Sequence, residues 1–412
     1  MKRIYALDIF RGIAIMLVVV FHRFLYDWQG IEGFFFSEEP WNDYPWLTLF
    51  MIFVAMGSIF TLITGIVSAF SIYNRVSSGR STMKPIILGS IIMMVFLLFW
   101  AFLVRFFFAP RAFIRGKYYY GVLSGSIRFK SLHFPSLGLM ILITGTLGII
   151  GISGFILTLI LVILFRNGGM EKIGRNKIVL GVIGVLILIL SVILSFILQP
   201  IIYDAFDNGN YLLALILALL VADSFPIFPI LGFAFFGAIL GIQLAKGEDE
   251  KKIIKSWTKF ALLILITGFV LLMVFGSQGY FNMNFIRFIQ LGFYFFIIII
   301  LLKVVDFKPE EKQEKILSRT KSIFRFSRVS LTIYVFESAI AVIFHFFLDY
   351  MIPGWNNDIL NILLFGVFNL VLWWIILIFW EKKDFKGSIE WMGAQLMQKL
   401  SGKSKDKSIK SI

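Results

Sequence analysis

The sequence predicts an all-α protein, a polytopic bundle of transmembrane helices. Hydrophobic residues make up 59% of the 412 residues and charged residues only 15%, and the mean hydropathy is +0.89. Soluble domains of this length do not have such a composition. Several apolar runs exceed the ~18 residues that indicate a spanning helix. They lack the period-two alternation of a membrane β-barrel, so we expect helices throughout.

The expected membrane segments are apolar runs bounded by polar or charged loops. They fall near 5–27, 46–70, 85–104, 132–165, 177–201, 211–245, 257–276, 286–306, 329–349 and 357–380. Two of these, 132–165 and 211–245, are longer than the ~20 residues of one straight crossing. Pro226 and Pro229 interrupt the second. Each is either a hairpin or one crossing with a re-entrant piece, so about ten crossings arise from 10–12 hydrophobic segments.

Loop charge predicts the orientation, because Lys and Arg accumulate on the cytoplasmic side of a membrane protein. The segment 27–43 has five acids and no Lys or Arg, so it should face outward. The basic loops should face inward, namely 71–84, 166–177, 246–259, 303–328 and the C-terminus. We therefore expect a multi-pass protein of the cell (plasma) membrane with both termini cytoplasmic.

One basic stretch disagrees with this topology, because the count of crossings places it outside. It contains Arg105, Arg111, Arg115, Lys117, Arg128 and Lys130. Either the number of crossings before it is wrong, or the stretch folds back into the protein to bind an anion. Three neighbouring aromatic residues at 118–120 would help such binding.

Charge and cysteine content limit the partners and the metal sites that the chain can have. The net charge of +15 is concentrated in loops and in the tail, which indicates topology and contact with anionic lipid rather than nucleic-acid binding. The chain has no cysteine, and its three histidines are far apart, so we expect no metal site. We divide the chain into a membrane domain, 1–391, and a basic, largely disordered cytoplasmic tail, 392–412.

The first helix carries the most informative polar residues. Arg11 and His22 are eleven positions apart, close to three helical turns, so both project from one face about 16 Å apart along the axis. Asp8 is close enough to Arg11 for an ion pair. An arginine suits phosphate, and a neutral imidazole suits a general base. His22 can instead simply extend to the interface, which is also the expectation for Arg23.

Three further polar residues lie at membrane depth. Asp223 precedes Phe225-Pro226 and is either the cap of a broken helix or part of a site. Arg287, near Gln290, is either an interface anchor or a site residue. Glu337 is too deep for its side chain to reach the interface, so we expect it to pair within the bundle, structurally or in the site.

A family resemblance rests first on the run Arg3–Ala14, RIYALDIFRGIA. It resembles the signature that opens the core of the heparan-α-glucosaminide N-acetyltransferase-like proteins. It is also similar to acyltransferase family 3, whose arginine and histidine share the ten-residue gap between Arg11 and His22. Shorter similar patches follow it, namely Trp41-Asn42, 56–60, 225–232, 330–334 and 387–391.

The resemblance implies an enzyme that moves an acyl group, typically acetyl from acetyl-CoA, onto a sugar amine or hydroxyl. It implies that Asp8 and Arg11 hold the CoA. This sequence departs from the heparan-type pattern at Glu38, where those enzymes have a catalytic histidine. The implied base is therefore His22 or Glu38. Residues that would line the acceptor cavity are Trp41, Asn42, Asp223, Arg287 and Glu337.

Two functions of different classes follow. The first is a membrane-embedded N- or O-acyltransferase that uses acyl-CoA, without a metal, to modify a glycan, lipid headgroup or small amine at the outer side. The second is a multi-spanning transporter or lipid-handling protein whose polar path is lined by Arg11, His22 and Glu337. The expected partners are acyl-CoA, the acceptor and the bilayer, without nucleic acid; a homodimer is compatible with either function.

Overall fold

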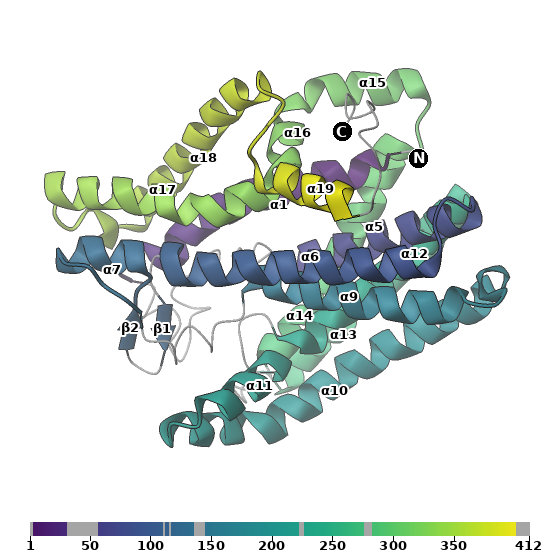
Figure 1. The fold of residues 1–412 in the computed structure, drawn as a ribbon, viewed down its shortest axis with the longest axis horizontal. Helices are drawn as coiled ribbons and strands as arrows, with labels where there is room; N and C mark the ends of the chain where they lie inside the picture. Colours follow the sequence, from purple (N-terminus) through teal and green to yellow (C-terminus); the bar gives the residue numbers. More distant parts are fainter. Residues whose placement is uncertain are drawn as a thin grey trace.

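The computed structural model describes residues 3–30, 57–109, 112–114, 117–135, 145–221, 226–275 and 282–400. Within these ranges, ten helices are long and apolar enough to cross a membrane, which confirms the predicted class of multi-pass helical membrane protein (Figure 1). They are α1 (Tyr5–Tyr26), α5 (Gly57–Ser77), α6 (Met83–Leu103), α9 (Thr146–Phe165), α10 (Ile173–Asp207), α12 (Ile227–Lys246), α13 (Glu250–Phe275), α14 (Asn282–Leu301), α17 (Ser330–Met351) and α18 (Ile359–Glu381).

Shorter elements connect or extend these helices. The short α-helices are α7 (Val122–Phe129), α11 (Tyr211–Val221), α15 (Glu310–Arg319), α16 (Lys321–Arg328) and α19 (Ile389–Leu400). π-Helical turns extend α6 and α14, as η1 (Val104–Phe108) and η3 (Leu302–Asp306), and 3₁₀ turns form η2 (Gly169–Glu171) and η4 (Trp355–Asn357). Strands β1 (Ala112–Ile114) and β2 (Lys117–Tyr119) form one antiparallel pair, with Phe113 opposite Tyr118.

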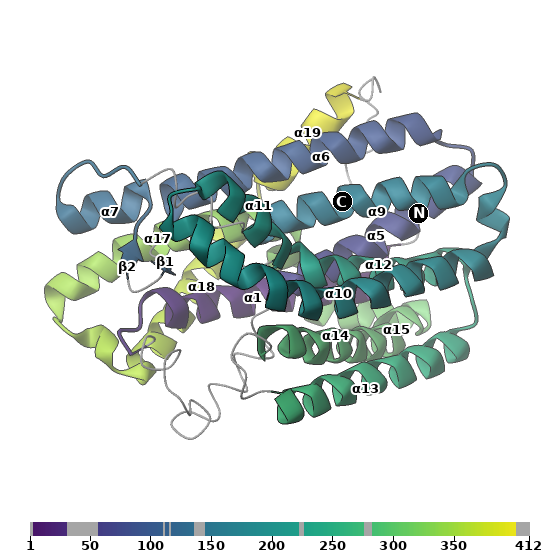
Figure 2. The same ribbon diagram turned by 90° about the horizontal axis from the view of Figure 1, so that it is seen from below.

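The overlong segment 211–245 divides at its prolines, as the sequence predicts. It forms the short helix α11 and the crossing helix α12, whose residue Phe228 has non-helical φ and ψ. Eleven residues of helix extend only about 16 Å, which is too short to cross a bilayer. The segment is therefore one crossing with a short accessory helix, and α11 packs on the second half of α10 (Figure 2).

Helix α1 lies inside the bundle, where it contacts α5, α14, α16, α17 and α18. Its first free N–H groups, from Tyr5 and Ala6, both donate to the carboxylate of Asp306, at 2.9 and 2.7 Å. Such groups have no partner within a helix, so this distant side chain acts as the cap of α1. The consequence is a fixed position for the helix that carries the candidate site.

Helices α5 and α12 pack closely next to α1 through glycines. A β-carbon at Gly237 would lie 2.5 Å from the carbonyl oxygen of Leu62, and one at Gly241 would collide with the carbonyl of Ile66. The Gly237-x-x-x-Gly241 repeat is therefore a close-packing surface. By contrast, α6 and α13 present large apolar side chains outward, which suits contact with lipid; examples are Val95, Phe99, Leu263 and Met273.

The basic loops meet at one end of the bundle. A cleft at the start of α1 is lined by residues of the loops after α5 and α12 and by Asp306, and Lys177 at the start of α10 bonds Glu248 there. At the opposite end, α7 contacts α17, and Arg128 interacts electrostatically with Asp349. The described residues of the basic stretch, 105–109, 112–114 and 117–130, therefore lie at the end of the bundle opposite the start of α1.

Helix α19 continues past residue 391, where the tail was expected to begin. Its carboxylate Glu390 accepts hydrogen bonds from the N–H groups of Leu331 and Thr332 and from the Thr332 hydroxyl, which in turn accepts from the N–H of Ile389. The starts of α17 and α19 thus cap each other. Residues 401–412 lie outside the described part of the chain.

Candidate functional site

The closest polar contact between α1 and α17 joins His22 to Glu337. Nδ1 of His22 lies 2.5 Å from Oε1 of Glu337, and the two side chains are 15% and 2% exposed. A carboxylate can only accept a hydrogen bond, so in a neutral His22 the proton is on Nδ1 and Nε2 is left as an acceptor. This arrangement orients the imidazole as a general base requires.

Arg23 binds the second oxygen of the same carboxylate. Its guanidinium donates to Oε2 of Glu337 at 2.7 Å and to Asp27 at 2.8 Å, and the side chain is 0% exposed. The expectation that Arg23 extends to the membrane interface is wrong. Two carboxylates, one on its own helix and one on α17, compensate its charge, and a buried charge needs such compensation.

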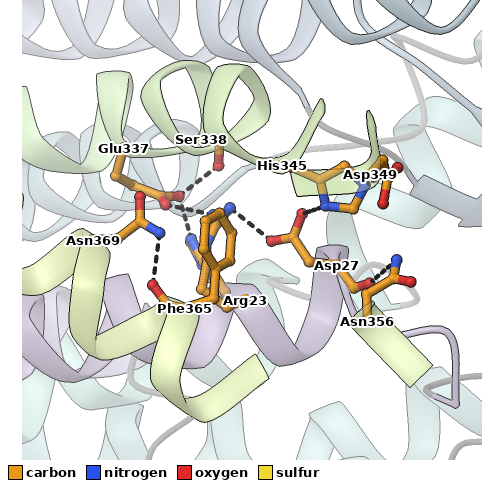
Figure 3. Close-up of polar contacts among 10 residues, drawn as sticks. Arg23, Asp27, Glu337, Ser338, His345, Asp349, Asn356, Phe365 and Asn369 are labelled. Carbon is orange, nitrogen blue, oxygen red and sulfur yellow. Dashed lines mark hydrogen bonds and ion pairs between the residues drawn. The ribbon is translucent and has the colours of Figure 1, made fainter. Parts of the chain in front are cut away.

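The contacts continue from Asp27 toward the end of the bundle (Figure 3). Nδ1 of His345 lies 2.8 Å from Asp27, and Nε2 of His345 lies 3.1 Å from Asp349. The indole of Trp355 donates to Asp349 at 2.7 Å, and the Asn356 amide donates to the Asp27 carbonyl at 3.0 Å. We call this set the buried network; its members are His22, Arg23, Asp27, Glu337, Ser338, His345 and Asp349, with the Ser338 hydroxyl donating to Glu337.

Two tyrosines flank His22. The ring centroids of Tyr26 and Tyr334 lie 5.0 and 6.1 Å from that of His22. Tyr26 also interacts electrostatically with Arg105, which lies on η1. The imidazole therefore has phenol groups beside it as well as the carboxylate that holds its Nδ1.

A second polar cluster lies at the opposite end of α1. Asp8 binds the guanidinium of Arg3 at 2.5 Å and that of Arg11 at 2.9 Å, which confirms the expected Asp8–Arg11 ion pair. Nε of Arg11 also donates to the hydroxyl of Ser327 at 3.1 Å. The Arg11 side chain is 34% exposed, and among the described residues no ion pair or hydrogen bond joins this cluster to the buried network.

A cleft of about 750 Å³ lies near this cluster, and Arg3 forms part of its wall. Its lining also contains Arg80, together with hydroxyl groups at 77–78 and the acids at 248–250. Hydrogen bonds from Lys177 and Gln243 hold the pKa of Glu248 below its usual value, although burial acts to raise that pKa. The cleft is open to polar ligands at the end of the bundle where α1 begins.

Arg287 occupies a third position, on α14, and is only 8% exposed. Its guanidinium donates to Gln290 at 2.8 Å, and Gln290 also lies 3.3 Å from the hydroxyl of Ser58. The described contacts thus place Arg287 inside the bundle, not at the interface, and apart from His22. Four other predicted site residues lie outside the described part of the chain, namely Glu38, Trp41, Asn42 and Asp223.

Sequence reasoning missed the roles of Asp27, His345 and Asp349. A signal was present, because Arg23 with Asp27 and His345 with Asp349 are both i,i+4 pairs of complementary groups in apolar helices. His345 contacts an acid with each ring nitrogen. Within the described ranges, no group of three or more His, Asp or Glu residues is arranged to hold a metal ion.

The fold defines a multi-pass helical membrane protein with a charged network buried between α1 and α17. No protein-family model matches the chain, and no curated protein is significantly similar to it in sequence. The function is therefore inferred from the geometry and chemistry of the site.

Proposed function

We propose that this chain is an integral membrane acyltransferase that moves an acyl group, most simply acetyl, from acyl-CoA to a hydroxyl or amine. The observation that carries the proposal is the His22–Glu337 contact of 2.5 Å. It leaves Nε2 of His22 as the proton acceptor, and the neighbouring Arg23 keeps Glu337 in its ionised, orienting form. The resemblance of the first helix to membrane acyltransferases supports the same chemistry.

In the proposed reaction, Nε2 of His22 takes the proton of the acceptor hydroxyl or amine while the acceptor attacks the thioester carbonyl. The tetrahedral intermediate then collapses, the carbon–sulfur bond breaks, and the CoA sulfur leaves with the proton returned by His22. Atoms balance as acyl-CoA plus acceptor giving acylated acceptor plus CoA. Glu337 stabilises the imidazolium that forms between the two steps. Glu38 remains the alternative base that the resemblance implies.

The proposal assigns CoA to the end of the bundle at which α1 begins. The basic loops gather there, so we assign that end to the cytoplasm and the protein to the cell membrane. Arg11, oriented by Asp8, would contact the phosphates or pantetheine arm of CoA. The rise of α1 separates Arg11 from His22 by about 16 Å, a distance that an extended pantetheine arm can bridge. The acceptor, a glycan, lipid headgroup or small amine, would enter from the outer side.

The test uses purified full-length protein with radiolabelled acetyl-CoA and a panel of amino and hydroxyl acceptors. His22→Asn should lower transfer roughly 10²- to 10⁴-fold, the usual contribution of a general base. His133→Asn is the matched control, because His133 lies in the loop after α7, and it should retain activity. Equal transfer by wild type and His22→Asn would contradict the assigned base, and no turnover of acetyl-CoA by wild type would contradict the enzyme.

CoA binding has its own measurement. CoA should protect the wild type against heat unfolding, and Arg11→Ala should weaken that protection while His22→Asn leaves it intact. Unchanged protection in Arg11→Ala would show that CoA phosphates bind elsewhere, such as the cleft beside Arg3.

Transport is the second candidate, and one observation favours it. The buried network runs without a gap from His22 to Asp349, whose side chain is 41% exposed. Charged residues in series inside a membrane protein often mark an ion or proton path. Arg11, which the sequence placed on that path, bonds to Asp8 and Ser327 instead. Proteoliposomes that show substrate-driven proton flux, abolished in Asp27→Asn but without acetyl-CoA turnover, would favour transport over acyl transfer.

A further inference from the structure

Arg105 is a cation in the last turn of the candidate membrane-spanning helix Met83–Phe108, and the proposed reaction does not use it. It lies on the π-helical turn η1, which extends α6 at the end of the bundle opposite the start of α1. No ion pair or hydrogen bond of its guanidinium is found among the residues that the structure describes. Arg11 and Arg23, in contrast, each bind carboxylates. An arginine without a carboxylate partner among these residues keeps its donors available for an anionic ligand.

The neighbours of Arg105 connect it to Tyr26, the residue whose ring lies next to His22. A β-carbon at Gly145 would lie 3.3 Å from Nε of Arg105, so the side chain lies directly against the residue that precedes α9. Its charge interacts with Tyr26, whose ring is next to His22. The turn itself is held against α17, because Phe108 packs on Phe336 with ring centroids 5.3 Å apart.

Phe336 directly precedes Glu337 in the chain. The packing of η1 on α17 therefore sets the position of the turn that carries Arg105 relative to the residue that orients His22. The π-helical turn η1 ends the helix that begins with α6, and it carries Arg105 at the same end of α1 as the imidazole. A guanidinium and the phenol of Tyr26 together supply several hydrogen-bond donors and no negative charge, which is the chemistry of an anion site.

We propose that Arg105 binds an anionic group, a phosphate or carboxylate, on the acceptor whose hydroxyl or amine reacts at His22. This inference rests on the proposed function and adds the substrate class, an anionic acceptor. The guanidinium holds the anion through paired hydrogen bonds, and Tyr26 donates one more. The acceptor is thereby oriented with its reacting group toward Nε2 of His22. Arg105 is a binding residue in this scheme, and the proton transfer belongs to His22.

Heat unfolding of the purified full-length protein, without acyl-CoA, tests the anion site directly. The probes are glucosamine 6-phosphate and glucuronate, each compared with the counterpart that lacks the anionic group, glucosamine or glucose, at constant ionic strength. Wild type should be stabilised by at least one anionic probe and not by the counterpart that lacks the anionic group. Arg105→Gln should bind that probe about tenfold to hundredfold more weakly, as expected for the loss of a charge-assisted hydrogen bond.

Arg128→Gln is the matched control. Arg128 is an exposed cation of the same outer stretch, with its guanidinium 5.1 Å from the ring centroid of Tyr120. This variant should bind the anionic probe as wild type does, and Arg105→Lys should recover part of the loss. Equal weakening in Arg105→Gln and Arg128→Gln would overturn the proposal, because it would indicate general attraction to a basic surface. Equal protection by the probes with and without the anionic group would overturn it as well.

A lipid headgroup and a soluble sugar acid can both supply the anionic group. Heat unfolding of the protein in nanodiscs of defined lipid composition distinguishes the two sources. Selective stabilisation by phosphatidylglycerol over phosphatidylcholine that requires Arg105 assigns the anion to a lipid; selective stabilisation by the soluble probes assigns it to a sugar or small metabolite.

The two proposals fail separately in these measurements. Acetyl-CoA turnover without Arg105-dependent anion binding removes only the anionic acceptor. Arg105-dependent anion binding without any acetyl-CoA turnover removes the enzyme and leaves the anion site.

Discussion

Two arginines on the same helix, Arg11 and Arg23, lie in opposite environments. Arg11 is 34% exposed and pairs with one acid, Asp8, which it shares with Arg3. Arg23 is fully buried between two carboxylates, Asp27 and Glu337, the second on a helix 314 positions away in sequence. Water can screen and solvate the first guanidinium, whereas only protein groups can compensate the second.

This difference separates two kinds of polar site. The Arg11 cluster can exchange its protein partners for a ligand at little cost, since its groups are already partly hydrated. The buried network cannot lose a member without leaving a charge unpaired in a medium of low dielectric constant. A co-substrate that comes and goes therefore suits the Arg11 end, and a permanently oriented base suits the His22 end.

The largest effect on stability should come from Arg23→Ala. This change leaves Asp27 and Glu337 buried without their cation, and truncation of one partner of a buried pair costs about 3–5 kcal/mol of stability. The free energy of unfolding in detergent should fall by that amount. A loss below about 1 kcal/mol, the value for an exposed pair, would mean that water reaches Arg23 and that the two regions do not differ.

Glu337→Gln should lower the free energy of unfolding by less than Arg23→Ala does. The amide keeps the shape and one acceptor, and Arg23 keeps Asp27, so we expect about 1.5–3 kcal/mol, the contribution of a hydrogen bond to a charged group. Transfer activity should also fall, because the amide cannot stabilise the imidazolium of His22. Activity at the wild-type level in a folded Glu337→Gln protein would exclude a role for Glu337 in orienting the base.

Glu390 provides a third case, a partly buried carboxylate outside the membrane spans that binds backbone N–H groups instead of an arginine. Burial raises the pKa of Glu390, an effect that its hydrogen bonds only partly oppose. The folded protein therefore holds this proton more tightly than the unfolded chain does, so stability should decrease as the pH rises above the usual range of a glutamate.

Thermal unfolding midpoints, measured from acidic to neutral pH, test whether stability decreases in this way as the pH rises. The difference in midpoint between wild type and Glu390→Gln should shift in favour of the variant as the pH rises, because glutamine cannot ionise. Glu248→Gln should show the opposite shift, because the pKa of Glu248 is lowered and its ion pair with Lys177 should strengthen as the pH rises. A shift in favour of Glu248→Gln as the pH rises would argue against this assignment of the two carboxylates.

The smallest effect on stability should come from Arg11→Ala. An ion pair of this exposure contributes about 0–1 kcal/mol, and salt should reduce even that. The free energy of unfolding, measured at low and high salt, should therefore change little. A loss comparable to that of Arg23→Ala would place Arg11 among the structural residues and remove its availability for a ligand.

Much of this molecule follows from local sequence. Long apolar runs can satisfy their backbone groups in lipid only as helices, so hydropathy alone predicts the ten spans and their order. The prolines mark the start of α12, because Pro226 precedes its first residue and Pro229 lies in its first turn, where a missing N–H has no helical partner to lose. The Asp8–Arg11 pair and the glycine face of α12 are likewise local, since both depend only on helical spacing.

The partners of the deep charges were decided only by the tertiary structure. Sequence places Arg23 near the end of a helix, where an arginine usually extends to the interface. It becomes a buried residue because α17 brings Glu337 against α1, and that contact joins positions far apart in the chain. Charge compensation depends on distance in space, whereas hydropathy depends on neighbours along the chain. The sequence alone therefore predicts the membrane bundle, and the packing of α1 on α17 creates its candidate site.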